Sequence, residues 1–133
     1  MVTGSSDRAG GTGIESRPPV QTKEELAMVK RYVLLGIVMR ILDNDIGVVG
    51  SSAAKLPRFY ESMLRGLQDR VLLEMAAIRK GFRESGIKVY NERRETDGLT
   101  AEYVCRGYHH RFTMRWGFVK TEAERLLKGY FPG

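Results

Sequence analysis

The sequence predicts an α+β fold that is mostly helical, with three helices and a β-hairpin between the second and the third (α-α-β-β-α). Three observations predict it. Apolar residues recur at steps of three and four over residues 22–42, 56–86 and 109–130. After the second segment the pattern changes to the alternation of a half-exposed strand. The strong turn dipeptide Asp97-Gly98 then follows. A chain of 133 residues suffices for one domain with a small core.

The first helix is predicted over residues 22–42. Thr22 and Glu25 form a capping-box signature, in which each side chain bonds the backbone amide of the other. Apolar positions follow two stripes of this helix, and the domain offers few other elements to cover both. Such a helix is either covered by its own domain or shared with another chain. We expect a homodimer through this helix, with contacts from Val33, Ile37 and Met39, and coverage within the chain is the alternative. The turn-forming residues 43–47 are expected to end the helix.

The second helix is predicted over residues 56–86, after a linker at residues 47–55. Pro57 suits the first helical turn, and Gly86 is the expected C-terminal cap. One continuous apolar stripe runs along the helix, made of Leu56, Tyr60, Met63, Leu64, Leu67, Val71, Met75, Ile78 and Phe82.

The hairpin is predicted at residues 87–95 and 99–107. Its first arm alternates apolar and polar residues, and its second arm is rich in strand-forming residues. A helical second arm is the alternative, because its residues do not exclude a helix. The third helix is predicted over residues 109–130 from a stripe of Phe112, Trp116, Val119, Ala123, Leu126 and Tyr130.

Residues 1–21 are rich in glycine and serine and hold few large apolar side chains. Such a segment cannot bury enough surface to offset its ordering entropy, so we expect a disordered tail followed by a single domain over residues 22–133. The tail has no apolar stretch of the kind found in a secretory signal. The most apolar run, residues 33–39, is far shorter than the roughly 20 residues of a membrane span. The lone Cys105 cannot form an internal disulfide, so a cytoplasmic location is expected.

Catalytic and metal centres are not expected. Cys105 and His109 are four residues apart, but at a strand-to-helix junction they would not share a face. Zinc sites need four suitably spaced ligands, and the pair Asp43 and Asp45 lacks the remaining ligands of a calcium loop. Phosphate-binding glycine motifs are absent from the folded part, so no cofactor is expected.

The charge balance favours an acidic partner. The formal net charge is +6 and the sequence pI is about 9.7, which suits nucleic acid, anionic lipid or an acidic protein without selecting among them. Arginine forks match phosphate oxygens, and exposed aromatic rings stack on bases. Basic and aromatic residues interleave near the predicted hairpin and third helix, where Arg111 and Arg115 would share a helical face. The alternative is that the aromatic residues are core and the arginines a solvated rim. The basic residues of this cluster are Arg93, Arg94, Arg106, His109, His110, Arg111 and Arg115.

Four short segments carry a resemblance to a known family: Leu56-Pro57-Arg58-Phe59-Tyr60, Ile87-Lys88-Val89, Arg106-Gly107-Tyr108 and Tyr130-Phe131. Over about residues 56–131 the chain resembles the small YhjD-like proteins of Bacillus and related Firmicutes. The resemblance implies a bacterial cytoplasmic protein and transfers no functional residues. From the residues themselves we expect a non-enzymatic binding or regulatory module that self-associates through its first helix. The alternatives are a nucleic-acid-binding protein and, third, peripheral binding to anionic membrane.

Overall fold

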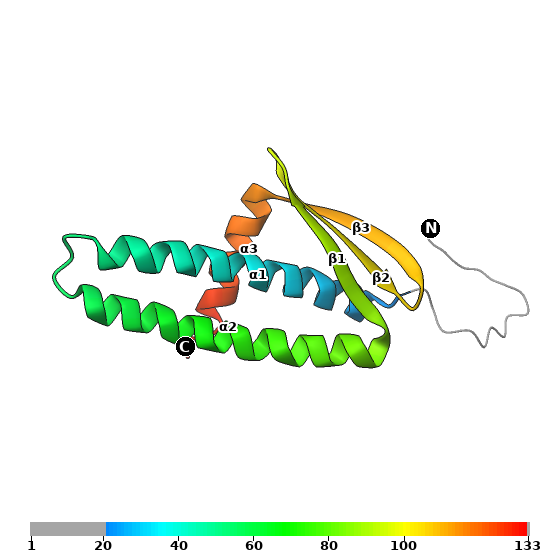
Figure 1. Ribbon diagram of the computed structural model, residues 1–133, viewed down its shortest axis with the longest axis horizontal. Coiled ribbons are helices and arrows are strands. Elements are labelled where there is room, and N and C mark those ends of the chain that lie inside the picture. Colours follow the sequence, from blue (N-terminus) through cyan, green and yellow to red (C-terminus); the bar gives the residue numbers. More distant parts are fainter. Residues whose placement is uncertain (1–20, 133) are drawn as a thin grey trace, which may run out of the picture.

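The computed structural model describes residues 21–132 and has an α+β fold with three helices and one three-stranded antiparallel sheet. Two long helices form an antiparallel hairpin. The sheet covers one end of this hairpin, and the short third helix crosses its middle (Figure 1). Along the chain the elements are α1 (Lys23–Gly50), α2 (Pro57–Ser85), β1 (Ile87–Arg94), β2 (Gly98–Cys105), β3 (Tyr108–Arg115) and α3 (Trp116–Lys128).

The ends of the two long helices confirm the predicted caps. The Thr22 side chain accepts a hydrogen bond from the Glu25 amide at 3.0 Å, and the Glu25 carboxylate accepts one from the Thr22 amide at 2.9 Å. Gly86 ends α2 with a φ of 71°, a left-handed conformation that suits glycine. The capping box and the glycine cap therefore set these two boundaries as the sequence predicts.

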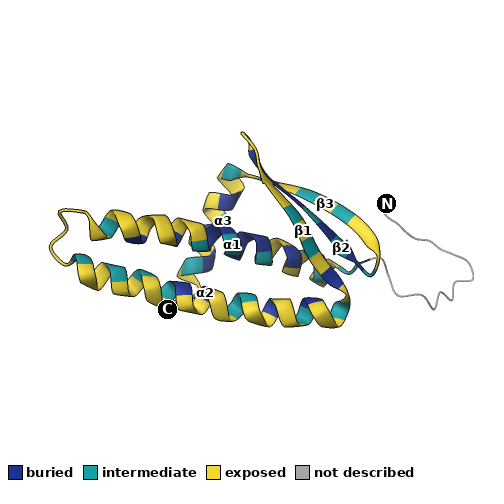
Figure 2. Ribbon diagram, in the orientation of Figure 1, coloured by how far each residue is buried: buried dark blue, intermediate teal, exposed yellow. Residues whose placement is uncertain are grey.

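The core lies between the long helices, α3 and the inner face of the sheet. The central strand β2 turns four side chains toward the helices, and all four are at most 1% exposed: Leu99, Ala101, Tyr103 and Cys105. Buried positions gather on β2 and on the middle of α1 (Figure 2). The alternate residues of β2 from Leu99 to Cys105 thus belong to the core. On the opposite face Thr100 is also buried, and Glu102 and Val104 are partly exposed.

Residues 108–115 form a third strand, which corrects the helix predicted from residue 109. The chain reverses direction at Arg106 and Gly107, with φ angles of 48° and 88°, as a two-residue hairpin turn requires. The following residues alternate between the two faces of the sheet, and β3 pairs with β2 along its full length. Arg111 and Arg115 therefore lie on a strand and not on α3. The strand predicted at residues 99–107 is confirmed, with β2 at Gly98–Cys105, and the helical alternative is wrong.

Helix α1 continues to Gly50, beyond the turn-forming residues that were expected to end it near Leu42. The Gln68 side chain of α2 donates a hydrogen bond to the Asp43 carboxylate at 2.8 Å, and Ile46 is buried. Contacts with α2 thus hold this segment helical and override its local preference for a turn. The connection between the helices is shorter than the predicted linker at residues 47–55.

Two of the three residues expected to mediate self-association lie in the core of the single chain. Val33 and Ile37 are only 1% and 6% exposed within the single chain, and Met39 is half-buried. Both apolar stripes of α1 pack within the chain: Tyr32 contacts Phe82 of α2, and Val33 and Ile37 belong to the core that includes residues of the sheet and α3. The part of this cover that comes from the sheet was not expected, because residues 108–115 were predicted as helix and form its third strand.

Residues 1–20 lie outside the described part of the chain, so the predicted tail at 1–21 is described only at its last residue. Gln21 accepts a hydrogen bond from the Tyr103 hydroxyl of β2. Among the described helices, none combines the length and the apolar character that crossing a bilayer requires.

Candidate functional site

The outward-facing side of the sheet gathers basic side chains from β1 and β3. The pairing places Arg111 opposite Glu102, His109 opposite Val104, and Lys88 also opposite Val104. Since the inner side chains of β2 are buried, the side chains paired with Glu102 and Val104 face solvent. We call this surface the outer sheet face. It consists of the exposed residues Lys88, Tyr90, Arg93, His109, Arg111 and Arg115 around Glu102.

Tyr90 is the aromatic residue of this face and is 47% exposed. Its hydroxyl lies 3.1 Å from Nδ1 of His109, and the two rings meet edge to face with centroids 5.7 Å apart. A bulge in β1 between Val89 and Asn91 brings Tyr90 to this side of the sheet. One face of an aromatic ring is therefore presented beside basic groups.

Glu102 offsets part of the positive charge. It accepts hydrogen bonds from Asn91 at 2.7 Å and from Arg93 at 3.3 Å, and Arg93 also lies 3.8 Å from Glu95. The hydrogen bond from Asn91, and then the charges of Arg93 and Arg111, lower the pKa of Glu102, which stays ionised. Within residues 21–132, Lys88, Arg111 and Arg115 have no carboxylate within 4 Å. The uncompensated positive charge thus lies mainly along β3.

Three of the seven basic residues singled out from the sequence are not part of this face. The guanidinium of Arg94 lies over the Trp116 ring, 5.3 Å from its centroid. His110 is half-buried on the inner side of the sheet and stacks on Tyr103 with ring centroids 5.1 Å apart. Arg106 lies in the β2–β3 turn. The structure therefore brings together four of the seven, namely Arg93, His109, Arg111 and Arg115.

Arg106 is a structural residue that joins three elements. Its guanidinium donates to both oxygens of Glu25, at 2.7 and 2.8 Å, and to the Ser85 carbonyl at 3.2 Å. Its backbone amide donates to the Gly86 carbonyl at 2.8 Å. The hydrogen bonds from Arg106 lower the pKa of Glu25 to about 2. These contacts tie the turn to the start of α1 and the end of α2.

Cys105 and His109 lie on opposite faces of the sheet and do not form a nucleophile–base pair. Cys105 is fully buried, and burial raises the pKa of its thiol. Its sulfur lies 3.8 Å from a Glu25 oxygen. In the described chain, no three histidine, cysteine or acidic side chains gather as metal ligands would.

Sequence reasoning missed Lys88 and Tyr90 as members of the outer sheet face. The signal for Lys88 was present, because it alternates with the core residues Ile87 and Val89. The position of Tyr90 depends on the bulge, which no local pattern announces.

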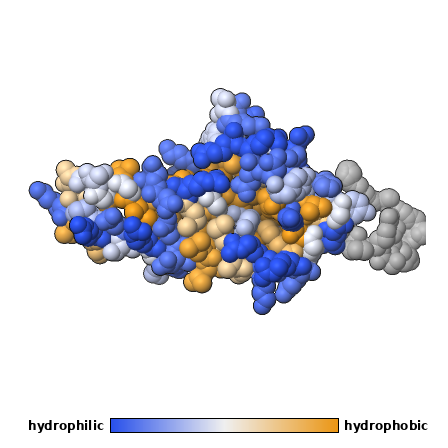
Figure 3. Space-filling view, viewed as in Figure 1, coloured by the Kyte–Doolittle hydropathy of each residue, from blue (hydrophilic) through white to orange (hydrophobic). Residues whose placement is uncertain are grey.

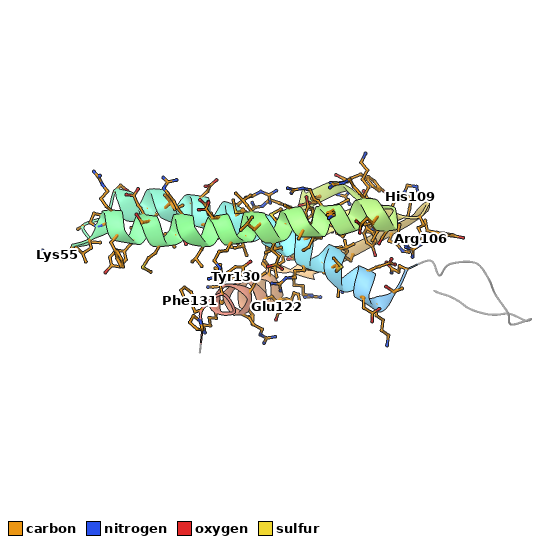
Figure 4. The ribbon with its side chains drawn as sticks, turned by 90° about the horizontal axis from the view of Figure 1, so that it is seen from below. Lys55, Arg106, His109, Glu122, Tyr130 and Phe131 are labelled. Carbon is orange, nitrogen blue, oxygen red and sulfur yellow. The ribbon has the colours of Figure 1, made fainter. Side chains whose placement is uncertain are left out.

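A small pocket lies between α1 and α3, with Glu122 and Tyr130 on its wall (Figure 4). Its volume is about 190 Å³. Pockets for small organic ligands usually start at roughly 300 Å³. The outer sheet face is therefore the better candidate site.

Comparison with known proteins places most of the chain in one family. Residues 20–133 match the family model described as YhjD protein. Searches of curated proteins and of solved structures returned no significant match.

Proposed function

The chain belongs to the YhjD family, and we propose that it is a non-enzymatic binding module that holds single-stranded nucleic acid on its outer sheet face. The observation that carries the proposal is the gathering of Lys88, Arg93, His109 and Arg111 on the outer sheet face, which also presents the exposed ring of Tyr90. A cytoplasmic bacterial location belongs to the same proposal.

The arrangement of charge favours a phosphate backbone that runs along β3. Arg111 and Arg115 are four residues apart, about 14 Å along an extended strand, so they contact different phosphates. Glu102 repels phosphate from the middle of the face. Arginine forks bind phosphate oxygens in pairs, and counterions released from the nucleic acid drive association.

The shape and the aromatic group favour a single strand over a duplex. An open sheet face with an exposed ring offers a stacking platform for unpaired bases, which every base can use. Reading a duplex requires an element that enters a groove. Tyr90 supplies the ring, and its contact with His109 orients it.

The test is a fluorescence-anisotropy titration of labelled single-stranded RNA, single-stranded DNA and duplex DNA at about 50 and 200 mM salt. The double variant Arg111→Ala/Arg115→Ala should weaken binding, because two phosphate contacts are lost. The slope of log binding constant against log salt concentration should become less steep by about 1.4 for a single strand. The matched control is Arg58→Ala/Arg125→Ala, which removes the same charge from exposed sites outside the face, whose side chains are 94% and 74% exposed.

A second pair of variants tests the stacking. Tyr90→Ala should weaken binding about tenfold, since one base–aromatic stack contributes roughly 1–3 kcal/mol. Tyr90→Phe keeps the ring and should bind nearly as well. The proposal is wrong if no strand binds at low salt. It is also wrong if the control double variant weakens binding as much as the variant on the face, since net charge alone would then explain the affinity.

A further inference from the structure

Strand β3 forms a free border of the sheet. The strand order is β1-β2-β3, so among the described strands each outer one pairs on one side only. Strand β1 carries a bulge between Val89 and Asn91, which interrupts its regular pairing. Strand β3 (Tyr108–Arg115), which is described in full, has no bulge and no proline, and it pairs with β2 without interruption over eight residues. A regular border of this kind is a template for a further strand.

The hydrogen-bond pattern of the sheet shows which backbone groups of β3 point outward. Cys105 and Tyr108 flank the two-residue turn, so this pair exchanges both of its backbone hydrogen bonds. Pairs of this kind alternate with pairs that exchange none. The hydrogen bond from the Trp116 amide to the Asp97 carbonyl, at 3.1 Å, has the position that this alternation requires. The backbone groups that point away from β2 are therefore those of His109, Arg111 and Thr113.

The described part of the chain leaves these outward groups unpaired. Within residues 21–132, the outward amides and carbonyls of His109, Arg111 and Thr113 have no hydrogen-bond partner. In Figure 1, α3 continues from one end of β3, and no described helix runs along its outer border. Unpaired backbone groups at the border of a sheet are open to the addition of an extended peptide.

On the outer side of the sheet this border is basic. Within the described chain, no carboxylate lies within 4 Å of Arg111 or Arg115. Glu102 lies opposite Arg111 on β2 and already accepts hydrogen bonds from Asn91 and Arg93. Figure 3 shows mainly hydrophilic surface over the part of the molecule where the sheet lies. The outer side chains of an added strand would lie about 5 Å from the two arginines, so carboxylates at these positions would complete ion pairs.

On the inner side of the sheet the same border is aromatic. Tyr108, His110 and Phe112 alternate with the basic residues of β3. Tyr108 is 48% exposed, and the other two are half-buried. The amine of Lys30 lies 5.8 Å from the centroid of the Phe112 ring, so α1 underlies this part of the border. Apolar side chains on the inner side of an added strand would cover these rings.

We propose that β3 binds an extended segment of another protein in which acidic residues alternate with apolar ones, and that this segment adds to the sheet as a fourth, antiparallel strand. Its acidic residues face Arg111 and Arg115, and its apolar residues cover the aromatic row. A second copy of the chain does not fit, because pairing of two β3 strands brings like-charged arginines together. The inference goes beyond the proposed function, in which nucleic acid contacts side chains and leaves the border of the sheet unpaired.

The test is a fluorescence-anisotropy titration of a labelled peptide as long as β3, eight residues, in which glutamate alternates with valine. The full chain is added up to about 500 μM, since a single added strand is a small interface that binds weakly. A matching peptide with lysine in place of glutamate should bind about tenfold more weakly or worse. Methylation of the glutamate amides, which face β3 in the proposed pairing, should abolish binding. Methylation of the valine amides, which face away, is the matched control and should not.

Two variants of the chain test the backbone and the charge separately. Thr113→Pro removes an outward amide, which a border strand tolerates, and should weaken the glutamate peptide about tenfold, whereas Thr113→Val keeps the amide and should bind normally. Arg111→Glu/Arg115→Glu should reverse the preference toward the lysine peptide. The control Arg58→Glu/Arg125→Glu makes the same change of charge at exposed sites outside the sheet and should still prefer glutamate. Circular dichroism checks that each variant is folded.

The proposal is overturned if the wild type does not bind the glutamate peptide at the highest concentration. It is also overturned if both methylation patterns weaken binding equally, or if the control double variant reverses the preference as well. Sedimentation equilibrium of the chain alone is run in parallel, and a dimer that Thr113→Pro dissociates and Thr113→Val keeps would assign the border to a second copy instead. Should Thr113→Pro fail to fold, the methylated peptides test the border on the wild type. The titration contains no nucleic acid, so its failure leaves the proposed function standing.

Discussion

The ion pair between Glu25 and Arg106 should make a measurable share of the stability depend on pH. The variant Glu25→Gln removes the charge and keeps the capping box, because glutamine also serves at this position of the helix. The folded pKa of Glu25 is about 2, against an ordinary value of 4.5. Each pKa unit corresponds to about 1.4 kcal/mol, so the difference sets an upper limit of roughly 3.5 kcal/mol on the contribution of the pair. The two side chains are 25% and 17% exposed, and solvent screening lowers the expected value to about 2 kcal/mol.

The direction of the pH dependence follows from the lowered pKa. Above about pH 4.5 the carboxylate is ionised in both the folded and the unfolded chain, and the full contribution is present. As the pH falls from about 4.5 toward 2, the unfolded chain takes up the proton first and the contribution disappears. The free-energy gap between wild type and Glu25→Gln should therefore be about 2 kcal/mol near pH 7 and close to zero near pH 2.

Urea denaturation followed by circular dichroism measures this gap at both pH values. The control is Glu24→Gln, which removes an exposed carboxylate from the same helical turn and should change the stability little. An equal gap at both pH values would refute the reasoning, because the loss would then come from packing and not from the ion pair.

Three further predictions concern the core and the sheet. Gly98→Ala should lower the free energy of unfolding by more than about 2 kcal/mol, because the added Cβ would lie 2.2 Å from a β3 carbonyl oxygen. Gly66→Ala is the control: its Cβ would meet nothing within 4 Å, and the variant should raise the free energy of unfolding by up to about 1 kcal/mol. Urea denaturation of both variants checks the pairing of β2 with β3. Leu35→Ala should lower the free energy of unfolding by about 3 kcal/mol in the same assay, because Leu35 is fully buried. Burial lowers the pKa of His110, so the free energy of unfolding should fall as the pH drops below about 6.5. His110→Asn should reduce that fall, which urea denaturation between pH 7 and 5 measures.

The sequence predicted the elements whose boundaries depend on local chemistry. Thr22, Glu25 and Gly86 mark helix ends through hydrogen bonds and backbone angles set within a few residues. The third strand was missed because Phe112 and Trp116 have the spacing of a helix that continues to Val119. The alternation of residues 108–115 and the turn at residues 106–107 contained the correct signal.

The candidate site was predicted in part for a similar reason. Arg111 and Arg115 stay together because residues four apart share a face on a strand as well as on a helix. Arg106 was misassigned because its partner Glu25 is 81 residues away, and no local pattern encodes that contact. His110 alternates to the inner face, where its place depends on the register of β3 with β2. Long-range pairing therefore decides which basic residues remain accessible.

The link between Arg106 and the start of α1 also bears on the order of folding. The helical hairpin and the three-stranded meander each join neighbouring parts of the chain, so each closes short loops and forms early. The first turn of α1 is joined to the sheet by contacts that span 80 residues or more, at Glu25 and at Gln21. We expect such closure to come late in folding and to open more readily than the core. Amides at the start of α1 should therefore exchange with solvent hydrogen sooner than those around Val38, even while the rest of the domain stays folded.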